Sequence, residues 1–315
     1  MQTRNIGHSG LAVSLVGLGC NNFGALDVER SRKVVHRALD LGITLFDTAD
    51  VYGNRGGSEE QLGEILGPRR KDIVLATKFG MQMDDAGTQM GASRRYILSA
   101  VEASLKRLKT DWIDLYQLHR ADPKTPMEET LSALDDLIRA GKVRYIGCSN
   151  VPAWGVADAS WTARERRLQR FICAQDEYSL LERDVERELV PALEAHGMGL
   201  IPYFPLASGL LTGKYRRDAD MPAGTRMALM KRLADRYMTE RNWKIVEGLE
   251  TFCRNRDRTL LELAFSWLVS RSPVASVIAG ATRPEQIEQN VKAVEWALSA
   301  EDLAEVDRIT RDKPA

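Results

Sequence analysis

The 315-residue sequence predicts a single (β/α)8 TIM barrel, with one domain spanning residues 1–315. Short apolar runs alternate with longer amphipathic segments, and a spacing of about thirty residues between runs is that of a strand–helix–strand unit. Eight such units close a barrel of roughly the usual length. Because 44% of the residues are hydrophobic, the chain has enough apolar side chains for one large core.

The segment before the first strand departs from this rhythm. Residues Arg4–Val13 contain the glycine-rich turn that is typical of a β-hairpin. We expect this hairpin to form a plug over the bottom of the barrel.

The eight predicted strands are β-branched runs whose hydrophobicity is almost continuous. Runs without polar alternation indicate strands that are covered on both faces, as in a parallel sheet. In chain order the runs are Ser14–Gly19, Ile43–Asp47, Ile73–Lys78, Trp112–His119, Val143–Cys148, Phe171–Gln175, Gly199–Tyr203 and Val274–Gly280.

Helical periodicity appears between these runs. The segments Glu29–Leu41, Arg94–Leu108 and Met127–Ile138 each place apolar residues on one face. Gly42 and Gly141 follow helical segments as stop signals. A doubly wound open sheet is the alternative arrangement, but the Gly-x-Gly-x-x-Gly turn that usually follows its first strand when it binds a dinucleotide is absent.

A long polar segment, Pro205–Arg241, follows the seventh strand and is rich in Gly, Met and Arg. We call it the lid segment. Loops of this length are usually either functional or disordered, and at the top of a barrel a substrate lid is the natural interpretation. A set of methionines suits a soft apolar substrate wall: Met81, Met83 and Met90, together with Met221, Met227 and Met230 of the lid segment. The alternative is a partly disordered loop whose methionines only pack on one another.

Composition argues against several classes of partner. Lys plus Arg and Asp plus Glu both number 44, so the basic surplus that is typical of nucleic-acid binding is missing. The four cysteines are scattered without a paired spacing, which predicts neither disulfides nor a metal site and favours a reducing compartment. Because no signal-like or membrane-spanning run is seen, we expect a cytoplasmic protein without membrane contact.

Polar residues gather where the predicted strands end. Asp47, Lys78 and His119 each end a strand. The later strand ends carry Ser149, Asn150, Gln175, Tyr203 and Gly280. In a barrel all strands end on one rim, which is where barrel enzymes keep their active sites, so these residues are predicted to meet.

A plainer interpretation is that polar residues merely mark where strands stop. On that view Asp47 caps a turn, Lys78 reaches solvent and His119 is a hydrogen-bonded core imidazole. An acid, a lysine and a histidine on one rim, with Tyr52 nearby, favour a functional site.

At these residues the sequence resembles the aldo-keto reductase superfamily. The string FDTADVYG at 46–53 is similar to its Asp-Thr-Ala…Tyr-Gly signature. The strings ATK, DLYQLH, IGCSN and QDEYS at 76–78, 114–119, 146–150 and 175–179 resemble further blocks in the same order, as does the spacing of Gly280, Arg283, Gln286 and Asn290. The resemblance spans nearly the whole chain and extends to bacterial general oxidoreductases and to beta subunits of voltage-gated potassium channels.

The resemblance implies an NADPH-dependent oxidoreductase that reduces small aldehydes or ketones with a tetrad of Asp47, Tyr52, Lys78 and His119. Hydride transfer to a carbonyl leaves negative charge on its oxygen, so a proton donor is needed. A free tyrosine has a pKa near 10, and we expect the Lys78 ammonium to lower that pKa in Tyr52. Asp47 would neutralise Lys78, and His119 would align the substrate oxygen.

The resemblance also implies where NADPH/NADP+ binds. Ser149, Asn150 and Gln175 match residues that hold the carboxamide, and Tyr203 matches the residue that stacks on the nicotinamide. The segment that covers the pyrophosphate contains Pro205, Leu206, Ser208, Leu210 and Lys214. The block that holds the adenosine 2′-phosphate and adenine contains Gly280, Thr282, Arg283, Gln286 and Asn290, at the start of a predicted helix that favours anions.

One position departs from the family pattern. The residue after the stacking aromatic is commonly serine, and here it is Phe204. The change removes a hydroxyl near the ribose and phosphate, which puts the local cofactor contacts in doubt.

Two other functions fit the same barrel. A cofactor-binding regulatory protein of slow turnover would keep the tetrad. An aldolase-like enzyme would use Lys78 as a Schiff-base nucleophile, but it would leave Tyr52, Gln175 and residues 280–290 without a role.

Overall fold

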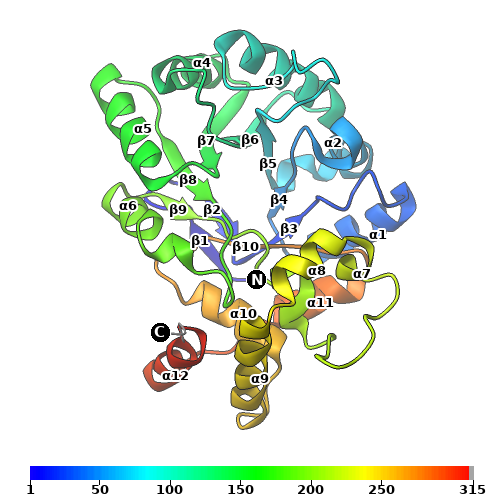
Figure 1. The fold of residues 1–315 in the computed structure, drawn as a ribbon. Helices are drawn as coiled ribbons and strands as arrows, with labels where there is room; N and C mark the ends of the chain where they lie inside the picture. The colour runs from blue at the N-terminus through cyan, green and yellow to red at the C-terminus, as the bar shows by residue number, and fades with distance from the viewer. Residues whose placement is uncertain (312–315) are drawn as a thin grey trace.

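The computed structural model describes residues 1–311, which form a barrel of eight parallel strands surrounded by helices (Figure 1). The last four residues of the predicted domain, 312–315, lie outside the described residues. The fold class expected from the sequence is confirmed.

The strands of the barrel follow one another in chain order around the sheet, β10-β3-β4-β5-β6-β7-β8-β9. Their bounds are β3 (Val16–Gly19), β4 (Leu45–Asp47), β5 (Val74–Phe79), β6 (Ile113–Leu118), β7 (Val143–Ser149), β8 (Phe171–Gln175), β9 (Gly199–Leu200) and β10 (Val277–Gly280). A parallel bridge between Leu200 and Val274 joins β9 to the residues that precede β10. The ring is completed there by a backbone bond of 2.9 Å from the Ala275 N–H to the Leu200 carbonyl.

All eight predicted strands are present, but the first, second and eighth begin later than expected and the seventh ends earlier. The sequence predicts a strand over Gly199–Tyr203, whereas β9 ends at Leu200. Pro202 has no N–H to donate to a ladder, which accounts for the early end of regular pairing. The Tyr203 N–H still bonds to the Asp176 carbonyl at 3.0 Å, so the chain continues along β8 to the rim.

The N-terminal hairpin closes one end of the barrel. Its strands β1 (Thr3–Asn5) and β2 (Ala12–Ser14) pair antiparallel. Ile6 and Val13 of the hairpin are fully buried and join a cluster of side chains inside the barrel. That cluster also contains Leu45, Ala76, Leu115, Cys173, Ile201, Ala275 and Ile278. The predicted plug is therefore confirmed.

A layer of helices covers the outside of the sheet and forms the larger core with it. The helices between the strands are α1 (Val28–Asp40), α2 (Tyr52–Leu66), α3 (Arg94–Leu108), α4 (Met127–Arg139), α5 (Ala153–Arg166), α6 (Leu189–Ala195) and α10 (Leu260–Val269), with the short helices η1 (Gly67–Asp72) and η2 (Asp184–Glu186). After β10 come α11 (Pro284–Lys292) and α12 (Ala300–Thr310). Asp27 and Ser93 begin α1 and α3 as N-caps, each accepting a hydrogen bond from a backbone N–H of the first turn.

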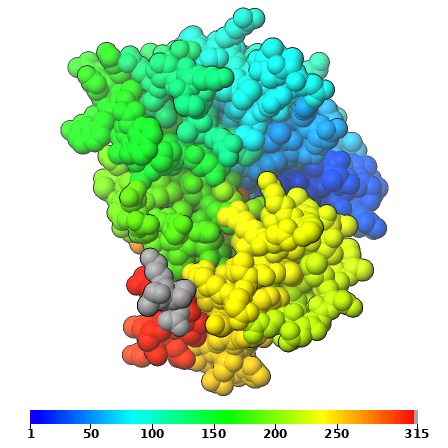
Figure 2. All heavy atoms as spheres, in the orientation of Figure 1, coloured from blue at the N-terminus to red at the C-terminus, as the bar shows by residue number. Residues whose placement is uncertain are grey.

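The lid segment is more ordered than the long loop that the sequence predicts. It contains η3 (Ala207–Thr212), α7 (Arg226–Leu229) and α8 (Lys231–Tyr237). The next helix, α9 (Glu240–Arg254), begins within the last two residues of the lid segment. Both α7 and α8 pack on η3, and Met227 and Tyr237 are buried in this packing (Figure 1). Figure 2 shows the lid segment, in yellow-green to yellow, as a continuous part of the molecular surface.

Candidate active site

A buried ion pair lies at the carboxyl ends of β4 and β5. The Lys78 ammonium donates to Asp47 Oδ2 at 2.7 Å and to the Thr48 carbonyl at 2.8 Å. Lys78 is fully buried and Asp47 is nearly so. Burial acts to lower the pKa of Lys78, but Asp47, with a smaller contribution from Tyr52, outweighs it and raises that pKa above its ordinary value. The lysine is therefore held charged in a dry site.

Two glutamine amides complete the surroundings of Asp47. Gln175, at the end of β8, donates to Asp47 Oδ1 at 2.8 Å, and Gln117 of β6 donates to the same oxygen at 3.3 Å. Gln175 is thus placed beside the tetrad that the sequence predicts. Gln117 was not predicted as a site residue; its signals are a polar side chain near the carboxyl end of an apolar strand and its place in the DLYQLH string.

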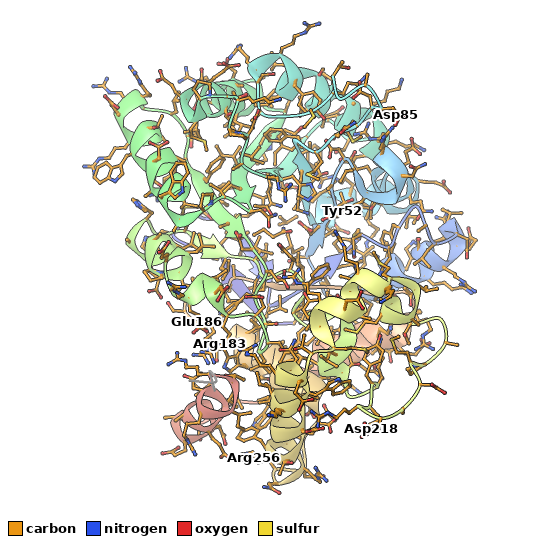
Figure 3. All side chains as sticks on the ribbon, viewed as in Figure 1. Tyr52, Asp85, Arg183, Glu186, Asp218 and Arg256 are labelled. Atoms are coloured by element: carbon orange, nitrogen blue, oxygen red, sulfur yellow. The ribbon has the colours of Figure 1, made fainter. Side chains whose placement is uncertain are left out.

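Tyr52 and His119 lie beside this ion pair. Tyr52 is the first residue of α2, and the Lys78 Nζ is 5.0 Å from the centroid of its ring. The ring of His119, just after β6, meets the Tyr52 ring edge to face with centroids 5.7 Å apart. Figure 3 shows Tyr52 near the middle of the molecule, at the ends of the central strands. The structure therefore brings together all four residues of the predicted tetrad.

The protonation of Tyr52 differs from the sequence expectation. Although part of its side chain is exposed, its surroundings are dense in protein, and burial raises the pKa of the phenol. Lys78 acts in the opposite direction without outweighing burial, so the pKa of Tyr52 lies above its ordinary value. Lys78 thus lowers the pKa of Tyr52 in the expected direction, but the expected net lowering is not found, because burial, which the sequence does not reveal, outweighs it.

His119 is held in its neutral form. Burial, with help from the charges of Lys78 and Arg120, lowers the pKa of His119 to about 3. Its Nδ1 atom is buried and has no hydrogen-bond partner among the described residues. A neutral imidazole beside Tyr52 can donate or accept a hydrogen bond without bringing a second positive charge.

The residues expected at the nicotinamide carboxamide form a connected network on the rim. The Ser149 hydroxyl donates to the Gln175 carbonyl at 2.6 Å, and the Asn150 amide donates to Ser149 Oγ at 2.9 Å. The Tyr203 hydroxyl donates to Asn150 Oδ1 at 2.9 Å. Asn150 adopts a left-handed φ of 52°, which is uncommon for a residue with a side chain and often marks a functional position. These four residues are thus adjacent, as the sequence predicts.

The segment expected at the pyrophosphate is a strained turn. Ala207 and Ser208 have φ values of 45° and 56° in η3, whose Leu210 is buried. The Ser208 hydroxyl is buried without a hydrogen-bond partner among the described residues. Lys214 is exposed and packs so close to Gly209 that a Cβ there would lie 2.9 Å from its ammonium. An unpaired hydroxyl and a nearby cation fit a phosphate ligand, and strain of this kind clusters at ligand clamps. Pro205 and Leu206 lead into this turn, Pro205 being buried.

The residues expected at the adenine end lie at the start of α11. Thr282 and Arg283 are exposed there, and Gln286 Oε1 accepts from their backbone N–H groups at 2.8 and 3.2 Å. Asn290 is buried on the same helix. Gly280 ends β10, where a Cβ would lie 2.9 Å from Asn21 Oδ1. Gln286 caps the helix, while the exposed Arg283 makes no side-chain ion pair among the described residues 1–311.

The lid segment places Arg226 near the tetrad, and this residue was not predicted from the sequence. The Arg226 guanidinium lies 4.9 Å from the centroid of the Phe204 ring, and its charge is among those that act on the pKa of Tyr52. Phe204, the residue that departs from the family pattern, has a left-handed φ of 51° and packs edge-on against Tyr203. The Phe204 ring therefore packs against the Arg226 guanidinium in a cation–π interaction. Only an arginine in a polar loop signalled this in the sequence.

Among residues 1–311, no group of three or more His, Cys, Asp or Glu side chains is arranged to hold a metal ion. No helix within the same residues has the length and apolar character needed to cross a membrane.

Known proteins resemble this chain over nearly its full length. The model of the Aldo/keto reductase family matches residues 15–311. A probable voltage-gated potassium channel subunit beta of Arabidopsis thaliana is 39% identical over 325 aligned positions, which cover 100% of this chain and 98% of that protein. The L-glyceraldehyde 3-phosphate reductase of Escherichia coli strain K12 is 36% identical, covering 99% and 93%. The uncharacterized oxidoreductase YrpG of Bacillus subtilis is 36% identical, covering 96% and 94%.

Proposed function

Because the chain belongs to the aldo/keto reductase family, we propose that it is an oxidoreductase that uses NADPH to reduce aldehydes and ketones to alcohols. Tyr52 is the general acid of this reaction. The observation that carries the proposal is the buried Lys78–Asp47 pair at 2.7 Å, which lies directly beside Tyr52 and the neutral His119.

Each residue of the tetrad has a separate task. NADPH, when bound at the rim, would supply the hydride for the carbonyl carbon. The Tyr52 hydroxyl donates a proton to the carbonyl oxygen, and the phenolate that remains is stabilised by the Lys78 ammonium. Asp47 keeps Lys78 charged and aimed, because an unpaired ammonium in a dry site would be costly. His119 holds the carbonyl oxygen near Tyr52 with a neutral hydrogen bond.

The rim offers groups that fit a dinucleotide. The unpaired Ser208 hydroxyl and the cations Lys214 and Arg226 suit the pyrophosphate. The first turn of α11, with exposed Arg283, suits the 2′-phosphate that distinguishes NADPH from NADH. The network of Ser149 and Asn150 suits the carboxamide.

The test is a steady-state assay of the purified protein with NADPH or NADH and a panel of small aldehydes and ketones. A phosphorylated aldehyde belongs in the panel because of the name of the Escherichia coli relative. We expect carbonyl-dependent loss of NADPH absorbance. Tyr52→Phe should lower turnover by about 10²–10⁴ while NADPH binding, followed by tryptophan fluorescence, persists. A Tyr52→Phe protein with full turnover would require another proton donor.

A second candidate is a regulatory protein that binds NADPH and turns over slowly. The similarity to a probable potassium channel subunit beta favours it. NADPH binding without measurable carbonyl-dependent oxidation across the panel would support this candidate over the enzyme.

A further inference from the structure

The backbone that follows Tyr52 has positive φ at four consecutive residues. Gly53, Asn54, Arg55 and Gly56 have φ values of 69°, 62°, 67° and 124°. This left-handed turn separates Tyr52 from the regular part of α2. Left-handed φ is unfavourable for residues that carry a Cβ, so Asn54 and Arg55 keep it only if their surroundings impose it.

The backbone of the turn is closely packed on both sides, at Gly53 and at Gly56. A Cβ on Gly53 would lie 2.6 Å from the Phe23 carbonyl oxygen. A Cβ on Gly56 would lie 2.6 Å from Cδ of Arg107 in α3. The Arg107 side chain thus packs directly against the backbone of the turn, at the end that is farther from Tyr52 in the chain.

Arg107 is itself held by a buried carboxylate. Its Nε donates to Glu59 Oε2 at 2.7 Å, and Glu59, in the regular part of α2, is fully buried. The other oxygen, Oε1, accepts from the Thr77 hydroxyl at 2.6 Å, and Thr77 precedes Lys78 in β5. The ion pair therefore ties α3, α2 and β5 together around the turn.

Stability alone gives a weak reason for such an arrangement. Removing two charges from water is costly, and well-packed apolar side chains of similar volume often stabilise a core as well or better. A directional pair, in contrast, fixes the position of the elements that it joins. The elements here are the turn that follows Tyr52 and the strand that contains Lys78.

We propose that Glu59 and Arg107 are positioning residues, which hold the left-handed turn at residues 53–56 and so fix Tyr52 relative to Lys78 and His119. The inference rests on the proposed role of Tyr52 as proton donor and adds a mechanism that sets its position. Neither residue touches the reacting atoms.

The principal variant is Arg107→Met, which keeps the length of the side chain but removes its charge. We expect kcat to fall by about ten- to a hundredfold, the loss that small misplacement of a reacting group causes. NADPH affinity, measured by fluorescence titration, should stay within about twofold of wild type, because the residues proposed to bind the cofactor lie on other elements. Arg107→Lys should recover part of kcat. An unchanged kcat in Arg107→Met would overturn the inference.

Arg183→Met is the matched control. Arg183 is also mostly buried and pairs with Glu186 and Asp307, each at 2.8 Å. Figure 3 shows Arg183 and Glu186 at one side of the molecule, well away from the label of Tyr52. This variant should lose thermal stability like Arg107→Met but keep kcat. An equal loss of kcat in both variants would mean that destabilisation alone explains the effect and would overturn the inference.

A double variant separates positioning of Tyr52 from general damage. In a Tyr52→Phe background, Arg107→Met should change the residual rate by less than about twofold, because the donor that it positions is gone. A fall as large as in the wild-type background would overturn the inference while leaving the proposed function intact. Full turnover of Tyr52→Phe by itself would instead overturn the proposed function.

Gly56→Ala is a second route to the same question if Arg107→Met yields no folded protein. The new Cβ would push on Cδ of Arg107 and would also strain the backbone of the turn, because Gly56 has a φ of 124°, and it would remove no charge. A fall in kcat at unchanged NADPH affinity supports the inference, and an unchanged kcat overturns it.

Discussion

Lys78→Met should destabilise the folded protein strongly, in addition to its effect on turnover. The substitution removes an ammonium that donates to Asp47 and to the Thr48 carbonyl. Asp47 would be left as a buried carboxylate whose side chain is only 4% exposed.

The size of the effect follows from the partners that remain. Removing one member of a buried ion pair typically costs about 3–5 kcal/mol, because the other charge is left uncompensated. Asp47 keeps the amide hydrogen bonds from Gln175 and Gln117, at 2.8 and 3.3 Å. These bonds place the expected loss at the lower end, about 3 kcal/mol in the free energy of unfolding.

The assay is equilibrium unfolding in urea, followed by tryptophan fluorescence and circular dichroism. The loss should appear as a lower midpoint at an unchanged dependence on denaturant concentration. The double variant Asp47→Asn with Lys78→Met is the control, because it removes both charges and keeps an acceptor for the two glutamines. It should recover most of the stability lost in the single variant but none of the turnover.

Two results would refute this reasoning. A Lys78→Met protein within about 0.5 kcal/mol of wild type would mean that Asp47 does not depend on Lys78, since that is the range of ordinary surface changes. A double variant no more stable than the single one would mean that the loss comes from packing around the lysine stem and not from an unpaired charge.

Three further predictions concern the cofactor and pH. Arg283→Ala should weaken NADPH binding by about ten- to a hundredfold with NADH little changed, since a hydrogen bond to a charged group contributes about 1.5–3 kcal/mol; fluorescence titration of both cofactors tests this, and equal losses would contradict it. Burial and the charge of Glu59 raise the pKa of Asp50 to about 8, so its stabilising effect is complete below about pH 4 and is lost as pH rises through 8. Asp50→Asn should therefore flatten the fall of the melting temperature between pH 5 and 8, and an identical slope in both proteins would exclude this cause. His119, with a pKa of about 3, should leave no ionisation in kcat between pH 5 and 8, so a step near pH 6.5 that disappears in His119→Gln would contradict the neutral assignment.

Periodicity alone located most of the elements. The helix predicted over Arg94–Leu108 and the strand predicted over Phe171–Gln175 have the same bounds in the structure. Both segments combine an unbroken apolar pattern with clear flanking signals, such as the N-cap Ser93. The rule that parallel strands end on one rim then sufficed to predict that Asp47, Lys78 and His119 meet.

Features that depend on the packed environment could not be predicted in this way. The glycines at 53 and 56 are visible in the sequence, but the left-handed Asn54 and Arg55 between them are not, because contacts from α3 and from the chain after β3 impose their conformation. The short helices of the lid segment were hidden by the glycines and prolines that precede them. Their residues, around Met227 and Tyr237, become a helical face only when they are buried against η3.

In the proposed reaction, with Tyr52 as the proton donor, the raised pKa of Tyr52 changes how Lys78 has to act. A phenol whose pKa is raised by burial stays protonated at neutral pH, so Tyr52 carries its proton before a carbonyl binds. Burial becomes unfavourable only when the proton leaves, because a charged phenolate then forms in the same buried site. At that moment the Lys78 ammonium, already fixed by Asp47 at 2.7 Å, stabilises the new charge without rearranging. The lysine thus acts on the product of proton transfer more than on the resting acid, and its removal should lower kcat even though Tyr52 remains protonated.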